Sequence, residues 1–208
     1  MMARIKMAKI KMCGLFHPCD IRAANEIKPE YIGFVFSPGS RRYVTYGQAS
    51  ELKALLEPDI RAVGVFVDEN PKTVADLLDQ GVIDIVQLHG REDESYIKKL
   101  RTLTDCPVIQ AFCVKNEYDA AQAQRSTADY ILLDSGAGTG TIFDWKLIQD
   151  IQRPYFLAGG LSPDNVGEAV RDLYPYAVDV SSGIETDGRK DKIKMAAFAA
   201  AVRKEEKL

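Results

Sequence analysis

Two residues able to carry protons in catalysis stand where short apolar segments of the sequence end. Cys13 closes the segment Lys9–Cys13 and precedes Gly14, and Asp134 closes Ile131-Leu132-Leu133. A cysteine acts as a base only as its thiolate, so Cys13 needs a pKa below about 8.5. Asp134, with an ordinary pKa of about 3.9, must be held protonated or be reprotonated to act as an acid. The structural alternatives are a buried cysteine that packs as a small apolar residue and an aspartate that caps a helix or forms a turn.

Two further segments have the composition of phosphate-binding loops. Gly159-Gly160 precedes Leu161-Ser162-Pro163, and Ser181-Ser182-Gly183 follows an apolar segment near the C-terminus. Glycine lets backbone N–H groups approach phosphate oxygens closely, and serine hydroxyls add donors. Either segment alone is equally compatible with a tight turn. Both together favour a phosphate site.

A few other polar residues have weaker claims to a role. Arg41-Arg42 suits an anionic substrate group, with a solvated charge pair as the alternative. His89 is more readily assigned a structural role, and Asp68 a capping role. Four cysteines without a CxxC pair and two distant histidines give no zinc-ligand spacing, so we expect no metal.

The candidate residues need elements that bring them together. Eight short runs rich in apolar, β-branched or aromatic residues are expected to be strands: Lys9–Cys13, Tyr31–Phe36, Ala62–Val67, Ile83–Leu88, Val108–Phe112, Tyr130–Asp134, Tyr155–Ala158 and Ala177–Val180. Most are continuous apolar runs, typical of parallel strands covered on both faces. Helical character lies between them in Tyr46–Leu56, Pro71–Gln80, Glu92–Leu103, Glu117–Gln124, Pro163–Leu173 and Ile193–Lys204.

This alternation predicts βα repeats, and eight repeats favour a closed (β/α)8 TIM barrel over an open sheet. At 208 residues the barrel would be of minimal size. We expect a single domain over residues 1–208, with residues 1–8 as a flexible extension. In such a barrel the active site lies at the C-terminal ends of the strands, and loops after the last two strands commonly bind phosphate.

The bulk properties exclude several partner classes. The formal net charge of −3 gives no sign of the basic surface typical of nucleic-acid or membrane-surface binding. The basic N-terminal residues are not followed by the apolar stretch of a signal peptide, and Met195–Val202 is too short to span a bilayer. We therefore expect a cytoplasmic protein without nucleic-acid or membrane partners.

Eight short motifs follow one another from about Lys9 to the C-terminal helix. They are Lys11-Met12-Cys13-Gly14-Leu15; Gly33-Phe34-Val35-Phe36 with Ser40-Arg41-Arg42-Tyr43; Gly64-Val65-Phe66-Val67; Val86-Gln87-Leu88-His89-Gly90; Leu132-Leu133-Asp134; Gly138-Thr139-Gly140 with Phe143-Asp144-Trp145; Gly159-Gly160-Leu161; and Val178-Asp179-Val180-Ser181-Ser182-Gly183-Ile184-Glu185. In this order and spacing they resemble the phosphoribosylanthranilate isomerase family.

The resemblance implies a cofactor-free Amadori rearrangement of a phosphosugar–anthranilate substrate in tryptophan biosynthesis. It implies that Asp134 is the general acid and Cys13 the general base. Arg42 resembles the arginine that pairs with the anthranilate carboxylate, and Asp179 an aspartate near the sugar hydroxyls. The loops at Gly159-Gly160 and Ser181-Ser182-Gly183 would hold the phosphate. The family includes monomers and homodimers.

Two positions depart from the family pattern. Phe16-His17 stand where the family usually has threonine and often a polar residue, beside the proposed base. Thr141 or Ile142 stands where lysine or a similar residue is usual, next to the glycine-rich segment 135–141 that is suited to a lid.

Two other readings stay open on the residues alone. One is another phosphosugar isomerase or epimerase barrel, although Cys13 stands where the histidine-pathway isomerases have aspartate. The other is a barrel that binds a phosphosugar without turnover.

Overall fold

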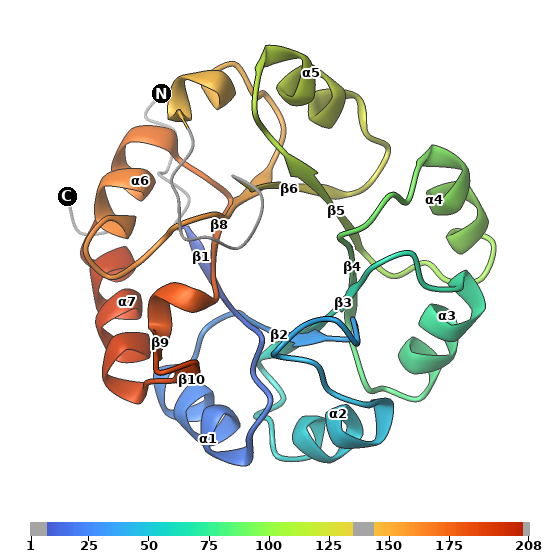
Figure 1. The fold of residues 1–208 in the computed structure, drawn as a ribbon, viewed down its shortest axis with the longest axis horizontal. Coiled ribbons are helices and arrows are strands. Elements are labelled where there is room, and N and C mark those ends of the chain that lie inside the picture. Colours follow the sequence, from blue (N-terminus) through green and yellow to red (C-terminus); the bar gives the residue numbers. More distant parts are fainter. Residues whose placement is uncertain (1–7, 135–143, 206–208) are drawn as a thin grey trace.

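The computed structural model describes residues 8–134 and 144–205. Eight strands form a closed barrel in chain order, with every neighbouring pair parallel and β1 paired to β8. The strands are β1 (Lys9–Cys13), β2 (Tyr31–Val35), β3 (Arg61–Phe66), β4 (Ile85–Leu88), β5 (Val108–Cys113), β6 (Tyr130–Asp134), β7 (Tyr155–Leu157) and β8 (Ala177–Val180). Figure 1 shows this ring of strands inside a ring of helices. The predicted (β/α)8 barrel is confirmed.

The outer ring consists of seven α-helices and a 3₁₀ helix among the described residues. They are α1 (Pro18–Ile27), α2 (Tyr46–Lys53), α3 (Pro71–Asp79), α4 (Glu94–Leu100), α5 (Glu117–Arg125), η1 (Trp145–Ile148), α6 (Val166–Leu173) and α7 (Lys192–Lys204). Asn70 caps the N-terminus of α3, because its side chain accepts a hydrogen bond from the N–H of Lys72 at 3.0 Å. Helix α6 starts three residues later than expected, since residues 163–165 form a turn.

Helix α1 was not predicted from the sequence. Pro18 occupies its first turn, where a missing N–H costs nothing. The Asp20 carboxylate accepts hydrogen bonds from the N–H groups of Phe16 and His17, at 3.1 and 3.0 Å. A carboxylate within the first helical turn therefore fixes the chain that leaves β1.

A short hairpin follows β8 and was also not predicted. Strands β9 (Glu185–Thr186) and β10 (Arg189–Lys190) pair antiparallel after the 3₁₀ turn η2 (Ser182–Ile184). Asp187 and Gly188 join them with φ angles of 51° and 77°. Positive φ at both central residues is the geometry of a type I′ turn, which Asp-Gly favours. The hairpin lies beside the last barrel strand (Figure 1).

The core has two layers, one on each face of the barrel wall. Inside the barrel a small cluster contains Tyr31, Val63, Ile85, Ile109, Leu132, Phe156, Ala158 and Ala177. A larger cluster fills the space between the strands and the surrounding helices. Burial on both faces explains why the strand sequences are continuously apolar.

The described residues cover part of the predicted single domain. Residues 1–7 of the predicted extension lie outside the described residues, whereas Ala8 is buried. The glycine-rich segment 135–141 and the departures at Thr141 and Ile142 lie outside them too. A single domain over residues 1–208 stays a prediction. In the described part of the chain, no helix combines the length and apolar character needed to cross a membrane.

Candidate active site

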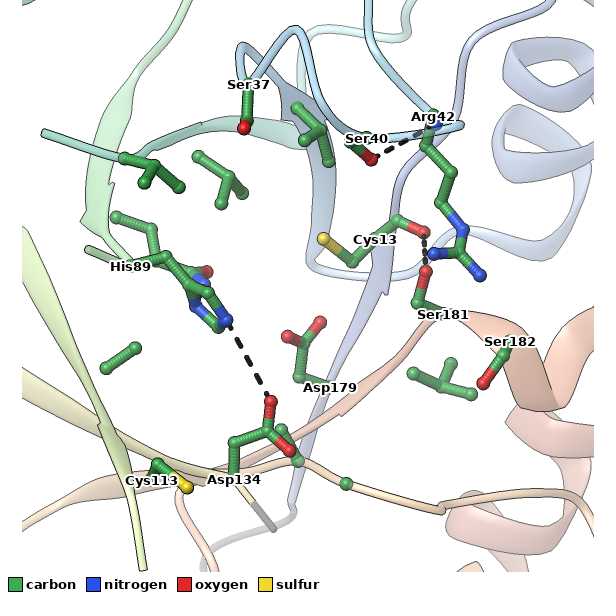
Figure 2. Close-up of a pocket in the computed structure, with 18 of the residues that line it drawn as sticks. Cys13, Ser37, Ser40, Arg42, His89, Cys113, Asp134, Asp179, Ser181 and Ser182 are labelled. Carbon is green, nitrogen blue, oxygen red and sulfur yellow. Dashed lines mark hydrogen bonds and ion pairs between the residues drawn. The ribbon is translucent and has the colours of Figure 1, made fainter. Parts of the chain in front are cut away.

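A cavity of about 750 Å³ opens at the C-terminal ends of the barrel strands. Every barrel strand, or the residues directly after it, contributes to its lining. The cavity brings together eight of the nine residues predicted for the site: Cys13, Arg42, Asp134, Gly159, Gly160, Asp179, Ser181 and Ser182. Figure 2 shows the side chains of Cys13, Asp134 and Asp179 around one hollow, with Arg42, Ser181 and Ser182 along one side of it.

Cys13 is the last residue of β1 and is 8% exposed. Its carbonyl oxygen accepts a hydrogen bond from the Ser181 hydroxyl at 3.0 Å, which ties the end of β1 to the loop after β8. Gly33 on β2 leaves space for the thiol, because a Cβ there would lie 2.7 Å from the sulfur. The two residues of the Phe16-His17 departure are absent from the cavity lining, and Phe16 packs against the core instead.

Two buried lysines lie near the thiol. Lys11 is two residues before Cys13 and so lies on the same face of β1. Its Nζ is fully buried and lies 2.9 Å from Oδ1 of Asp179. Lys190, from β10, is buried as well, and its Nζ donates to the carbonyl oxygen of Ser181 at 2.9 Å.

The electrostatics of Cys13 differ from the lowered pKa that the sequence analysis required. Burial raises the pKa of the Cys13 thiol, because a thiolate loses its hydration. The ammonium of Lys11 opposes this, the Asp179 carboxylate adds to it, and Lys190 again opposes it. Burial is the largest of these influences, so the pKa is raised. The neighbouring ammonium groups limit the increase.

Asp134 closes β6 and lies opposite a histidine. His89 Nε2 is 3.9 Å from Oδ2 of Asp134 (Figure 2). His89 Nδ1 is 3.0 Å from Nε2 of Gln87, which lies two residues earlier at the end of β4. His89 lines the cavity together with Gln87, although the sequence analysis favoured a structural role for it. The signal available in the sequence was the position of both residues at a predicted strand end.

Arg42 is held by a protein carboxylate. Its Nε and Nη2 donate to the two oxygens of Glu185, at 2.6 and 3.0 Å. Glu185 also accepts from Arg41 at 2.8 Å and from Lys190 at 2.8 Å. Burial acts to raise the pKa of Glu185, but the hydrogen bonds and charges of Arg42 and Lys190 outweigh it and lower this pKa to about 2. The pair uses two of the five N–H donors of Arg42, which also lines the cavity.

The loops after β7 and β8 meet at one side of the cavity. Gly159 and Gly160 have φ angles of 88° and 67°, in the left-handed region that favours glycine. Gly183, the ninth predicted residue, is absent from the lining. A Cβ on Gly183 would lie 1.9 Å from the carbonyl oxygen of Leu161, so this glycine lets the two loops touch. Gly183 therefore supports the predicted phosphate site without lining the cavity itself.

Metal ligands were not expected, and the described residues contain no group of three histidine, cysteine or acidic side chains placed to hold a metal ion. The groups that surround the cavity are instead a thiol, carboxylates, an imidazole and several cations. No role was predicted for Lys11, Glu185 or Lys190, and Gln87 was expected only at a strand end. Lys11 and Glu185 lie within the quoted motifs, whereas nothing in the sequence marks Lys190 as a neighbour of Cys13.

These features define a (β/α)8 barrel whose cavity, at the C-terminal ends of the strands, is lined by a thiol, carboxylates and an imidazole and by the glycine- and serine-containing loops after the last two strands. The profile of the N-(5'-phosphoribosyl)anthranilate isomerase family matches residues 10–201. This chain belongs to that family.

Individual relatives agree with the family assignment. The N-(5'-phosphoribosyl)anthranilate isomerase of Endomicrobium trichonymphae is 45% identical over 191 residues, which cover 89% of this chain and 93% of the relative. The crystal structure of phosphoribosyl anthranilate isomerase from Thermotoga maritima superimposes with a TM-score of 0.87 at 36% identity, covering 95% of this chain and all of that one. A phosphoribosyl anthranilate isomerase in complex with reduced 1-(o-carboxyphenylamino)-1-deoxyribulose 5-phosphate gives a TM-score of 0.85 at 36% identity, covering 95% of this chain and all of that one.

Proposed function

We propose that this chain converts N-(5'-phosphoribosyl)anthranilate to 1-(2-carboxyphenylamino)-1-deoxyribulose 5-phosphate, with Asp134 as general acid and Cys13 as general base. Family membership makes the chain an isomerase of tryptophan biosynthesis. The observation that supports the two roles is that Cys13 and Asp134 end two different strands and face the same cavity (Figure 2).

The proposed reaction needs only proton transfers. Asp134 protonates the furanose ring oxygen, the C1–O bond breaks, and the amine lone pair forms a C1=N bond. The Cys13 thiolate then removes the proton from C2, and the C2–H electrons form a C1=C2 bond as the nitrogen becomes neutral. The resulting enolamine tautomerises to the C2 ketone when C1 takes up a proton. C2 is oxidised and C1 reduced within one molecule, so the reaction balances without a cofactor.

The surroundings of Cys13 act on the proposed base in two opposite ways. A thiol whose pKa is raised by burial gives a scarcer thiolate, but a stronger base once it forms. Lys11 and Lys190 supply positive charge beside it. The ion pair between Lys11 and Asp179 also fixes a carboxylate at the cavity wall. Asp179 retains capacity to accept a hydrogen bond from a sugar hydroxyl.

The substrate has two anionic groups, a phosphate and a carboxylate, and each is assigned its own binding residues. The phosphate lies against Gly159-Gly160 and Ser181-Ser182, with Gly183 holding the two loops together. The anthranilate carboxylate pairs with Arg42, which Glu185 orients through two hydrogen bonds. A guanidinium anchored in this way is preorganised for a second carboxylate.

Three further predictions belong to this proposal. A small-molecule phosphosugar is the expected ligand, and we propose that the protein acts in the cytoplasm without a nucleic-acid or membrane partner. We also propose that it is a monomer or a homodimer. Sedimentation of the purified protein distinguishes these two states.

The test is turnover of phosphoribosylanthranilate generated from anthranilate and phosphoribosyl pyrophosphate, followed by loss of its fluorescence. We expect Cys13→Ala and Asp134→Asn each to lower kcat by at least about a hundredfold, because each removes one proton-transfer group. Cys113→Ala is the matched control, since Cys113 also lines the cavity but has no proposed role. A folded wild-type protein without turnover would contradict the proposed activity and leave the reading of a non-catalytic phosphosugar-binding barrel.

A further inference from the structure

Gln87 lines the cavity and carries a buried side-chain oxygen. The residue belongs to β4, is 1% exposed and lines the cavity wall. Its Nε2 lies 3.0 Å from Nδ1 of His89. Its Oε1 is buried and has no hydrogen-bond partner among the residues that the structure describes. A buried acceptor without a partner destabilises the folded protein, so the presence of an unpaired oxygen at this position calls for an explanation.

A second buried glutamine shows how the same side chain is used for structure alone. Gln110 lies on the neighbouring strand β5 and is 8% exposed. Its Nε2 donates to the carbonyl oxygen of Glu92 at 2.8 Å, and its Oε1 accepts from the Ser126 hydroxyl at 2.5 Å. Both ends of this amide are paired within the protein. In contrast, the amide of Gln87, which lines the cavity, is paired at one end only.

We propose that Gln87 is a substrate-binding residue whose Oε1 accepts a hydrogen bond from the sugar–amine part of the substrate. This inference rests on the function proposed above. The phosphate and carboxylate ends of that substrate are anions, which offer acceptors to the protein and not donors. An acceptor such as Oε1 needs a donor, and the donors of this substrate are its ribose hydroxyls and its anilinic N–H. Gln87 thus recognises the part of the substrate in which bonds change.

The other end of the amide connects this contact to the general acid. When Nδ1 of His89 accepts from Nε2 of Gln87, the imidazole proton lies on Nε2 of His89. That nitrogen is 3.9 Å from Oδ2 of Asp134 and directed at it (Figure 2). Gln87 therefore contacts the substrate on one side and fixes the ring that faces Asp134 on the other.

The first experiment compares Gln87→Leu with Gln110→Leu. Affinity for reduced 1-(o-carboxyphenylamino)-1-deoxyribulose 5-phosphate, which keeps the hydroxyl and N–H donors, is measured by calorimetry, and stability by urea unfolding. We expect Gln87→Leu to weaken binding about tenfold or more and to lower the urea midpoint less than Gln110→Leu, since its Oε1 is unpaired and the partner that it releases, His89, is exposed. Gln110→Leu should lower the midpoint, because it leaves its partners unpaired. Unchanged affinity in Gln87→Leu, or a loss of stability as large as that of Gln110→Leu, overturns the inference.

A second experiment separates direct contact from an effect through His89. The Gln87→Leu change is repeated in a His89→Ala background, with the same ligand. Direct contact predicts that the loss of affinity persists in that background. A loss that disappears there shows that Gln87 acts only through His89 and overturns the inference.

Wild-type binding and turnover, measured beside these variants, report on the proposed function itself. If both are absent, that function and the Gln87 contact fail together; if both are present while Gln87→Leu binds normally, only the Gln87 contact fails.

Discussion

The thiol of Cys13 illustrates how single residues set the chemistry of this site. Burial raises the pKa of Cys13, while the ammonium groups of Lys11 and Lys190 oppose the increase. The thiol also depends on its uncharged neighbours for its position. Gly33 pairs with Cys13 from β2, and because Gly33 has no side chain the sulfur can occupy the space where a Cβ would lie.

We predict that Gly33→Ala lowers kcat by about tenfold or more. The new Cβ would lie 2.7 Å from the Cys13 sulfur and 3.1 Å from its Cα, so the proposed base must move. Displacement of a reacting group by about 1 Å costs up to roughly a hundredfold in rate. Steady-state kinetics measure this change. Gly39→Ala is the control, because Gly39 also lines the cavity but a Cβ there meets nothing within 4 Å. Equal turnover of the two variants would contradict the prediction.

At the scale of elements, the hairpin β9–β10 joins the loops that surround the cavity. Glu185 begins the hairpin and binds Arg42, which follows β2. Lys190 ends it and binds both Glu185 and the backbone of Ser181. One short element thus connects the second and eighth βα units through buried charges. A buried carboxylate with several cationic partners is costly to neutralise.

We predict that Glu185 makes the stability of the protein depend on pH in the acid range. Its pKa falls from an ordinary 4.5 to about 2 on folding, so its contribution is present above about pH 4.5 and is lost as the pH falls toward 2. The shift corresponds to about 3 kcal/mol. Glu185→Gln should lower the free energy of unfolding at pH 7 and reduce its fall between pH 5 and about 2.5. Urea unfolding at several pH values measures both effects.

The matched control for this prediction is Glu51→Gln, because Glu51 is exposed on helix α2. Surface substitutions of this kind change stability by less than about 0.5 kcal/mol. A Glu185→Gln variant whose pH dependence equals that of Glu51→Gln would show that the buried carboxylate does not stabilise the fold.

For the molecule as a whole, closure of the barrel depends on a packed interior. The pairing of β1 with β8 brings the first and last strands together. Inside the barrel, the ring of Phe156 lies 5.6 Å from that of Tyr31 and 5.7 Å from that of Tyr130, measured between ring centroids. Tyr176 completes this aromatic group, with its centroid 5.6 Å from that of Phe156. The interior is therefore filled from strands on several sides of the ring.

We predict that Phe156→Ala lowers the free energy of unfolding by about 3–5 kcal/mol. The side chain is 1% exposed, and its removal leaves a cavity that the closed barrel wall cannot collapse to fill. Urea unfolding followed by circular dichroism and by fluorescence measures the loss. Leu103→Ala is the control, since Leu103 is 45% exposed and should lose less than about 1 kcal/mol. Similar losses in the two variants would argue against a tightly packed barrel interior.

Much of the fold was predictable because most of the residues in the strands are apolar. The predicted bounds of β1, β6 and β8 agree with the structure, and the other strands differ by a few residues at their ends. Helix α1 and the hairpin were missed. The hairpin has only two residues in each strand, and α1 begins at polar contacts of Asp20 with two backbone N–H groups.

The sequence by itself determined the barrel and the positions of the residues proposed for catalysis. Strand ends of a parallel barrel must meet at one edge, so Cys13 and Asp134 were expected near each other. Only the tertiary structure decided what charges surround them. Lys11 and Asp179 are 168 residues apart and pair because β1 lies beside β8. The raised pKa of Cys13, the clamp on Arg42 and the half-paired amide of Gln87 likewise depend on burial and on contacts distant in sequence, which local patterns do not encode.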